Sequence, residues 1–177
     1  MRKKTLALTL SAMFVALGVL FPIMFHSVGL GSIFLPMFWP IAAAAFFLDW
    51  PIAVAAAVLT PLVSSLFTGM PPVSPPIMQM IMLELSVLSC AIVVVYRRTR
   101  LGLFWPLLIG LIFSRIMLIL FIVIVAPLFG LPPKLFSLGL LMQGLPGVMT
   151  MLIVTPIIVS RIKHEPIFSN RKHVIQA

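Results

Sequence analysis

Three charged residues fall inside or beside the apolar segments of the sequence: Asp49, Glu84 and Arg115. A charged side chain in a bilayer costs about 2.5–3.5 kcal/mol on insertion scales, so each of these residues is a candidate functional group. A carboxylate and a guanidinium at similar depth can hold the polar groups of a small molecule, or they can pair with each other and fix helix packing. The sequence leaves both roles open for Glu84 and Arg115.

Depth in the membrane connects these two residues with two amides. Counted at about 1.5 Å per residue from the expected outer ends of their helices, Glu84 and Gln143 lie roughly 10 Å deep and Arg115 roughly 16 Å. Gln79 lies nearer the outer entrance of the same helix as Glu84. These side chains predict a polar pocket that opens to the outside.

Other residue types that do chemistry are sparse. Asp49 precedes Trp50 at the expected inner end of a helix, which is typical of a turn residue that caps the next helix. The single Cys90 allows no intramolecular disulfide and no CxxC site. Neither an HExxH motif nor a GxxxxGK[ST] phosphate loop occurs. We therefore expect no enzyme activity, metal or cofactor, and any energy for transport would come from a partner or a gradient.

The composition indicates what surrounds these residues. The chain is 62% hydrophobic and 8% charged with a mean hydropathy of +1.26, whereas soluble domains are about 25% charged. Apolar and polar residues do not alternate as they would in the strands of a membrane barrel. We therefore predict an all-α integral membrane protein. The net charge of +9 lies mostly at segment ends, which indicates a bilayer rather than nucleic acid as the partner.

The apolar segments predict six transmembrane helices in one compact bundle that forms a single membrane domain, 1–177. The second segment is short for a span and indicates a tilted or broken element, because a span needs about 20 residues. A polar tail, 163–177, follows the last helix. The expected helices cover about residues 5–25, 37–48, 52–68, 77–96, 101–126 and 136–162.

The basic residues predict the orientation, since cytoplasmic loops carry the excess of Lys and Arg. With a cytoplasmic N-terminus, only Lys134 lies outside and Arg115 lies within a span. Both termini are then cytoplasmic. The residues placed inside are Arg2, Lys3, Lys4, Arg97, Arg98, Arg100, Arg161, Lys163, Arg171 and Lys172.

Five motifs follow one another along the chain: the Ala12–Ala16 segment AMFVA, FLPMFWP over 34–40, TPLVSSLFTGMPP over 60–72, MLEL over 82–85 and SRI over 114–116. Together they resemble the motifs of one transporter family, the substrate-binding S components of energy-coupling factor (ECF) importers. The resemblance covers nearly the whole chain from Lys4 to Ile162, and SSLFTGMPP is its most specific segment.

The resemblance implies a multi-pass subunit of the bacterial cytoplasmic membrane that binds a vitamin or related micronutrient from outside. It implies docking of the first helix, through Ala12 and Ala16, onto a transmembrane T component that is connected to two cytoplasmic ATPases. Small residues spaced in this way let another helix approach closely. The loops that follow the first and third helices would form a gate, which includes Phe34, Pro36, Ser65, Thr68, Gly69 and Met70.

The sequence departs from the family pattern at places that bear on the ligand. Related sequences often have His where Phe38 or Trp39 stands, and Gly where Ser114 stands. Phe38 and Trp39 offer apolar rings for stacking, so we expect them in the ligand site. The ligand stays open among cobalamin, a thiamin precursor, pantothenate and other compounds. The alternative function is a stand-alone oligomeric secondary transporter that uses Glu84 as a proton or ion site.

Overall fold

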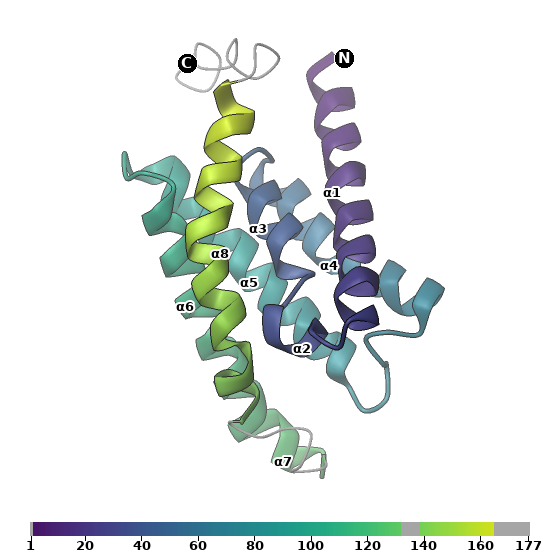
Figure 1. Ribbon diagram of the computed structural model, residues 1–177. Helices are drawn as coiled ribbons and strands as arrows, with labels where there is room; N and C mark the ends of the chain where they lie inside the picture. Colours follow the sequence, from purple (N-terminus) through teal and green to yellow (C-terminus); the bar gives the residue numbers. More distant parts are fainter. Residues whose placement is uncertain (1, 132–138, 165–177) are drawn as a thin grey trace.

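The computed structural model describes residues 2–131 and 139–164, with side chains from Lys4 onward, and these residues form helices and connecting turns without any strand (Figure 1). This confirms the predicted all-helical class. The elements in chain order are α1 (Arg2–Ser27), α2 (Gly31–Phe34), α3 (Phe38–Ala45), α4 (Trp50–Thr68), α5 (Ile77–Arg98), α6 (Phe104–Leu120), the π-helical turn η1 (Phe121–Val125), α7 (Ala126–Leu128) and α8 (Gly139–His164).

Five helical segments are long and apolar enough to cross a membrane. Their mean hydropathies lie between 1.8 and 2.9, and the shortest of them has 19 residues, or roughly 28 Å at about 1.5 Å per residue. Large apolar side chains also cover their outward surfaces, for example Phe113 on α6 and Ile153 on α8. The protein is therefore suited to a multi-pass membrane location. The segments are Lys4–Ser27, Trp50–Thr68, Ile77–Arg98, Phe104–Leu128 and Gly139–His164.

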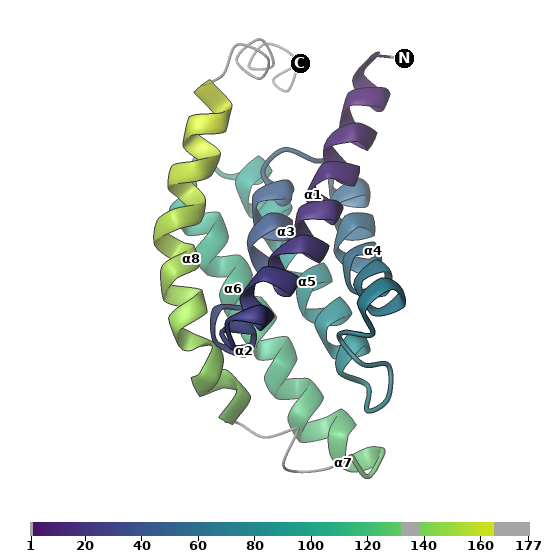
Figure 2. The same ribbon diagram turned by 45° about the vertical axis from the view of Figure 1, so that its right-hand side comes forward.

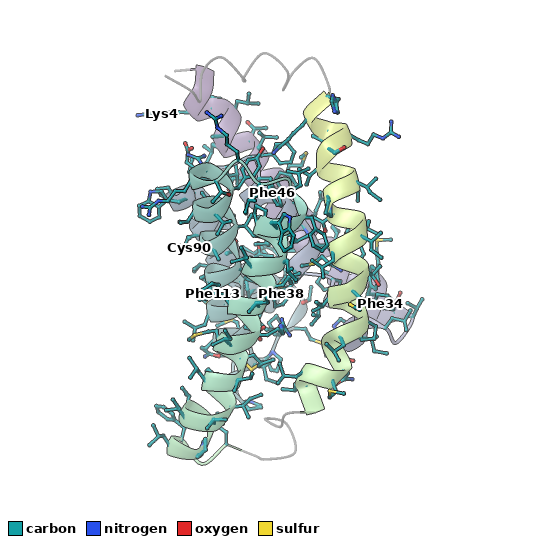
Figure 3. The ribbon with its side chains drawn as sticks, turned by 90° about the vertical axis from the view of Figure 1, so that its left-hand side faces the viewer. Lys4, Phe34, Phe38, Phe46, Cys90 and Phe113 are labelled. Atoms are coloured by element: carbon teal, nitrogen blue, oxygen red, sulfur yellow. The ribbon has the colours of Figure 1, made fainter. Side chains whose placement is uncertain are left out.

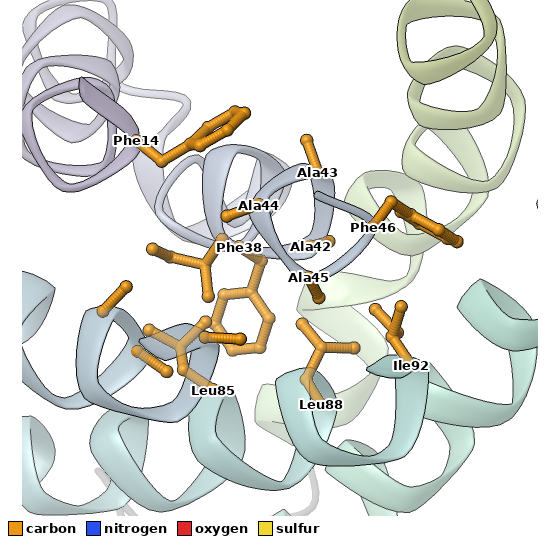
Figure 4. Packing of buried hydrophobic residues seen from close by; sticks show 14 of the residues in the cluster. Phe14, Phe38, Ala42, Ala43, Ala44, Ala45, Phe46, Leu85, Leu88 and Ile92 are labelled. Atoms are coloured by element: carbon orange, nitrogen blue, oxygen red, sulfur yellow. The ribbon is translucent and has the colours of Figure 1, made fainter. Parts of the chain in front are cut away.

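The short second segment is a broken helix. Leu35 ends α2 in the left-handed region, at φ 50° and ψ 53°, and α3 begins three residues later at Phe38. The expected element over 37–48 is thus α3 with a preceding helical turn, and together they are shorter than a typical span. Ala42 to Ala45 are all buried. These small side chains let α3 lie among α1, α5 and α8, as Figure 4 shows for Phe14, Leu85 and Leu88 around it.

Two glycines allow close contacts between the long helices. A Cβ added at Gly18 of α1 would lie 2.5 Å from Cγ2 of Thr60 on α4, and one at Gly110 of α6 would lie 2.7 Å from Cγ1 of Ile92 on α5. At distances below about 3 Å, a side chain at either glycine would force its neighbour to shift. The α5–α6 contact is extensive, and it brings Glu84 of α5 and Arg115 of α6 together.

The last part of the α6 segment differs from the expected regular helix over 101–126. The helix begins at Phe104, after Gly102, and passes through the π-helical turn η1 before the short α7. A π turn widens the helix by one residue and rotates the next residues about the helix axis. α1 begins and α8 ends at the same end of the molecule (Figures 1 and 2).

Candidate functional site

Glu84 of α5 and Arg115 of α6 form an ion pair in the interior of the described helices. Arg115 Nη2 lies 2.6 Å from Glu84 Oε2, and the side chains are only 16% and 4% exposed. The close α5–α6 approach at Gly110, about one helical turn before Ser114, lets both side chains reach each other. The depth count from the sequence placed these residues at similar levels, and the structure brings them into contact.

Ser114 is a member of this cluster that the sequence reasoning did not include as a site residue. Its hydroxyl donates a hydrogen bond of 3.3 Å to Glu84 Oε2, and the residue is fully buried. The Glu84 carboxylate therefore faces a hydroxyl donor and a cation from adjacent positions of α6. The signal that could have identified Ser114 is a hydroxyl directly beside an intramembrane cation.

Phe38 closes the cluster from α3. The Arg115 guanidinium carbon lies 5.1 Å from the Phe38 ring centroid, within the range of a cation–π contact. Phe38 is 3% exposed and is labelled in Figure 3, and Figure 4 shows its ring pointing from α3 toward α5, beside Leu85. The break at Leu35 allows α3 to begin at this position, and so it places the ring against Arg115.

α8 contributes a closely packed glycine rather than a polar side chain. A Cβ added at Gly144 would lie 3.5 Å from Arg115 Nη1 and 3.2 Å from a methyl carbon of Leu35. Arg115 belongs to α6, and its guanidinium thus lies close to α3, α5 and α8. Its Nε is buried and has no hydrogen-bond partner among the described residues.

The two predicted amides lie apart from the ion pair. Gln143 is exposed and its Nε2 donates to Ser32 Oγ at 2.8 Å. It precedes Gly144, so it lies at the right depth but about 100° around the helix from the residue that approaches Arg115. Gln79 donates from Nε2 to the Val73 carbonyl at 3.3 Å, while its Oε1 is buried without a partner among the described residues.

Trp39 also lies on another side of α3 from Phe38. Its indole Nε1 donates to the Phe34 carbonyl at 2.8 Å, which ties α3 back to the preceding break. Its ring lines an apolar groove between α1, α3 and α8. Of the predicted substrate-binding residues, the structure therefore brings together Glu84, Arg115 and Phe38.

The first predicted gate segment, which includes Phe34 and Pro36, packs closely against α8. A Cβ added at Gly147 would lie 2.7 Å from the Ile33 carbonyl oxygen, so the backbone of this segment lies directly on α8. The Phe34 ring lies 5.8 Å from that of Phe25, and Pro36 is buried. Leu35, which lies between Phe34 and Pro36, approaches Gly144 of α8, the same residue that approaches Arg115.

The second predicted gate segment, which includes Ser65, Thr68, Gly69 and Met70, is stabilised by hydrogen bonds within the end of α4 and the turn after it. Gly69 ends α4 at φ 72° and donates to the Ser65 carbonyl at 2.9 Å. Thr68 Oγ1 donates to the Ser64 carbonyl and Ser64 Oγ donates to the Met70 carbonyl, each at 2.7 Å. The Met70 side chain is exposed. Both predicted gate segments lie toward the end of the molecule opposite the start of α1 (Figure 1).

Two small residues of α1, Ala12 and Ala16, point away from the other described helices. Ala12 and Ala16 are exposed, whereas Ser11 and Gly18 are buried. Gly18 approaches α4, so the buried side of α1 is occupied within the chain. The side with Ala12 and Ala16 is available to lipid or to another helix.

Asp49 does not cap α4 through its side chain, although it is the residue before the helix. Its carboxylate instead accepts a hydrogen bond from Arg97 Nη2 at the end of α5, and the same nitrogen donates to the Leu48 carbonyl at 3.2 Å. The side chains of Asp49 and Arg97 are 63% and 40% exposed. The expected cap is therefore an interhelical ion pair.

Within residues 2–131 and 139–164, no group of three or more His, Cys, Asp or Glu side chains has the arrangement of a metal site. Comparison of the chain with family models, curated proteins and solved structures finds no significant match. The site is therefore interpreted from its own geometry.

Proposed function

We propose that this chain is the substrate-binding S component of an ECF-type importer, which binds a vitamin or related micronutrient from outside. The observation that carries the proposal is the buried Glu84–Arg115 pair, whose guanidinium still has an unpartnered Nε among the described residues. A buried donor without a partner costs about 1–3 kcal/mol. An acceptor group on a ligand would satisfy it, so the pair is suited to binding as well as to packing.

The proposed architecture has six spans, with α2 and α3 together as the second crossing between α1 and α4. The common end of α1 and α8 and the basic residues there support cytoplasmic termini. Lys4, Arg97 and Arg161 are among these residues. In this orientation the two gate segments face the outside, above the ion pair.

The exposed side of α1 supports docking onto a T component. Ala12 and Ala16 leave a flat surface for a second helix. The chain contains no phosphate loop, so ATP hydrolysis belongs to two partner ATPases in this proposal. The vitamin ligand, the T component and the ATPases are the partners of the proposed function.

Purification of the tagged chain from its native membranes tests this assignment. We expect a polytopic membrane subunit and ATPases with GxxxxGK[ST] loops to copurify with it. Ala12→Trp and Ala16→Trp should remove these partners and abolish uptake while ligand binding is retained. An Ala55→Trp variant, at an exposed position of α4, is the matched control.

A stand-alone carrier gives the opposite results. The purified chain alone would then move solute in liposomes along an ion gradient, with Glu84 as the proton or ion site. Unchanged partners and uptake in both alanine variants would contradict the docking role.

A further inference from the structure

An apolar groove lies between α1, α3 and α8, and neither Glu84 nor Arg115 lines it. It encloses about 320 Å³, at the lower end of the volumes of small-molecule pockets, roughly 300–1,000 Å³. Thr155 is its one polar lining residue and is itself buried. The apolar lining includes Phe14 and Leu17 of α1, Trp39 and Ala43 of α3, and Ile158 and Ile162 of α8.

The lining has the chemistry of a hydrocarbon site. A polar small molecule needs a few placed polar groups that fix its orientation, and this groove offers almost none. Two of the helices that border it, α1 and α8, are candidate spans, so acyl chains surround its open side in a bilayer. A flexible chain of methylene groups therefore fits the groove better than a soluble ligand does.

A cation lies at one end of the groove. Lys163 follows the lining residue Ile162, and its Nζ is 5.6 Å from the ring centroid of Phe47, another lining residue. The same ammonium bonds to the Tyr96 hydroxyl and lies 3.9 Å from the Tyr96 ring centroid. Lys163 does not itself line the groove, but these contacts hold its charge beside Phe47, one of the residues that do.

No carboxylate in the described part of the chain neutralises Lys163. Asp49 pairs with Arg97 and Glu84 pairs with Arg115. Two exposed basic residues lie toward the same end of the molecule, Lys4 near the start of α1 and Arg161 near the end of α8 (Figure 1). The apolar groove thus ends at a positively charged rim, which is complementary to a molecule with an acyl chain and an anionic headgroup.

We propose that this groove binds an anionic phospholipid, with one acyl chain between α1 and α8 and the phosphate at Lys163. Basic pockets between transmembrane helices on the cytoplasmic side are suited to anionic headgroups, and a Lys or Arg near the surface favours them about fivefold. The proposal does not depend on the importer function, because it uses neither the ion pair nor the Ala12 and Ala16 surface.

The fluorescence of Trp39 tests this proposal, because its ring lines the groove. The chain with Trp50→Phe and Trp105→Phe, both at exposed positions, retains Trp39 as its single tryptophan. It is reconstituted into phosphatidylcholine vesicles that contain a small fraction of brominated lipid. We expect brominated phosphatidylglycerol to quench Trp39 at about one-fifth of the concentration of brominated phosphatidylcholine that gives equal quenching.

Two pairs of variants separate the headgroup from the chain. In the same background, Lys163→Met should remove the preference for phosphatidylglycerol, whereas Arg98→Met, an equal change of charge at the end of α5, should keep it. Ala43→Phe should fill the groove and reduce quenching by both lipids. Ala55→Phe on α4 is the matched addition outside the groove.

Equal quenching by the two brominated lipids in the chain with intact groove would overturn the proposal. Absence of quenching by either lipid would also overturn it, since another occupant, such as a helix of a second copy, would then fill the groove. Neither result depends on a variant of the groove, so poor folding of Ala43→Phe does not obscure the outcome.

Discussion

Two ion pairs of the same chemical type lie at different depths in this molecule. Glu84 and Arg115 are 4% and 16% exposed among α3, α5, α6 and α8, whereas Asp49 and Arg97 are 63% and 40% exposed at the end of α5. Each connects consecutive elements of the chain, α5 with α6 in the first case and the start of α4 with the end of α5 in the second. Only the deep pair has an additional hydroxyl donor, an aromatic ring and an unpartnered nitrogen around it.

The surroundings of the two pairs determine what each can do. Water and salt screen an exposed pair, which contributes about 0–1 kcal/mol. A buried pair with one member removed costs about 3–5 kcal/mol, because the other charge is left in an apolar site. The deep pair is therefore the one whose polar groups a ligand can use, and the exposed pair has the character of a surface connection between α5 and the start of α4.

Removal of one charge from the buried Glu84–Arg115 pair should have the largest effect on the free energy of unfolding. We expect Arg115→Met to lower the free energy of unfolding by about 3–5 kcal/mol, since Glu84 remains buried without its partner. The double variant Glu84→Met/Arg115→Met should recover most of that loss. Unfolding by sodium dodecyl sulfate in mixed micelles measures both, and a double variant as unstable as the single one would contradict the explanation.

Separation of α5 from α6 should have the next largest effect. Gly110→Leu places a side chain where Ile92 and the Leu88 carbonyl leave no space, and overpacking of this kind costs about 1–3 kcal/mol. Gly102→Ala, which meets nothing within 4 Å, is the control. Equal stability of the two variants in the same unfolding assay would show that the close approach does not hold the pair.

Loss of the hydroxyl beside the deep pair should be smaller. Ser114→Ala removes one donor to the Glu84 carboxylate, for an expected loss of about 1 kcal/mol. Ser86→Ala removes a hydroxyl that donates within its own helix to Met82. A loss in Ser86→Ala as large as that in Ser114→Ala would mean that the bond to Glu84 has no special role.

Loss of the exposed pair should have the smallest effect. Asp49→Asn should change the free energy of unfolding by about 0–1 kcal/mol, and less at high ionic strength. The Arg98→Gln variant, at an exposed position next to Arg97, controls for general surface charge. A loss comparable to that of Arg115→Met would remove the distinction between the two pairs.

The sequence predicts helices well where long apolar runs end at basic residues or prolines, as for α5, which begins after Pro76 and ends at Arg98. It also predicts the depth match of Glu84 and Arg115, because residue count along a helix fixes depth. Residue count does not fix how each helix is rotated about its axis. Gln143 therefore lies at the expected level but hydrogen bonds to Ser32 instead of approaching Arg115.

Local backbone geometry was the other feature that the sequence did not reveal. The left-handed Leu35 and the π-helical turn η1 have no glycine or regular spacing that marks them. The break at Leu35 sets which of two adjacent aromatic residues reaches the ion pair, so Phe38 contacts Arg115 while Trp39 faces the groove. Such choices depend on tertiary packing of α3, which the pattern of one segment cannot specify.

The small molecule retained by the purified protein tests the central claim most directly. The chain is purified from cells in rich medium, and its bound compound is identified by mass spectrometry for the unchanged protein, for Glu84→Met/Arg115→Met and for Asp49→Asn. We predict the same vitamin-like compound in the unchanged protein and in Asp49→Asn, and its loss in the folded double variant. Retention of that compound at equal occupancy by the double variant would contradict a ligand site at the deep pair.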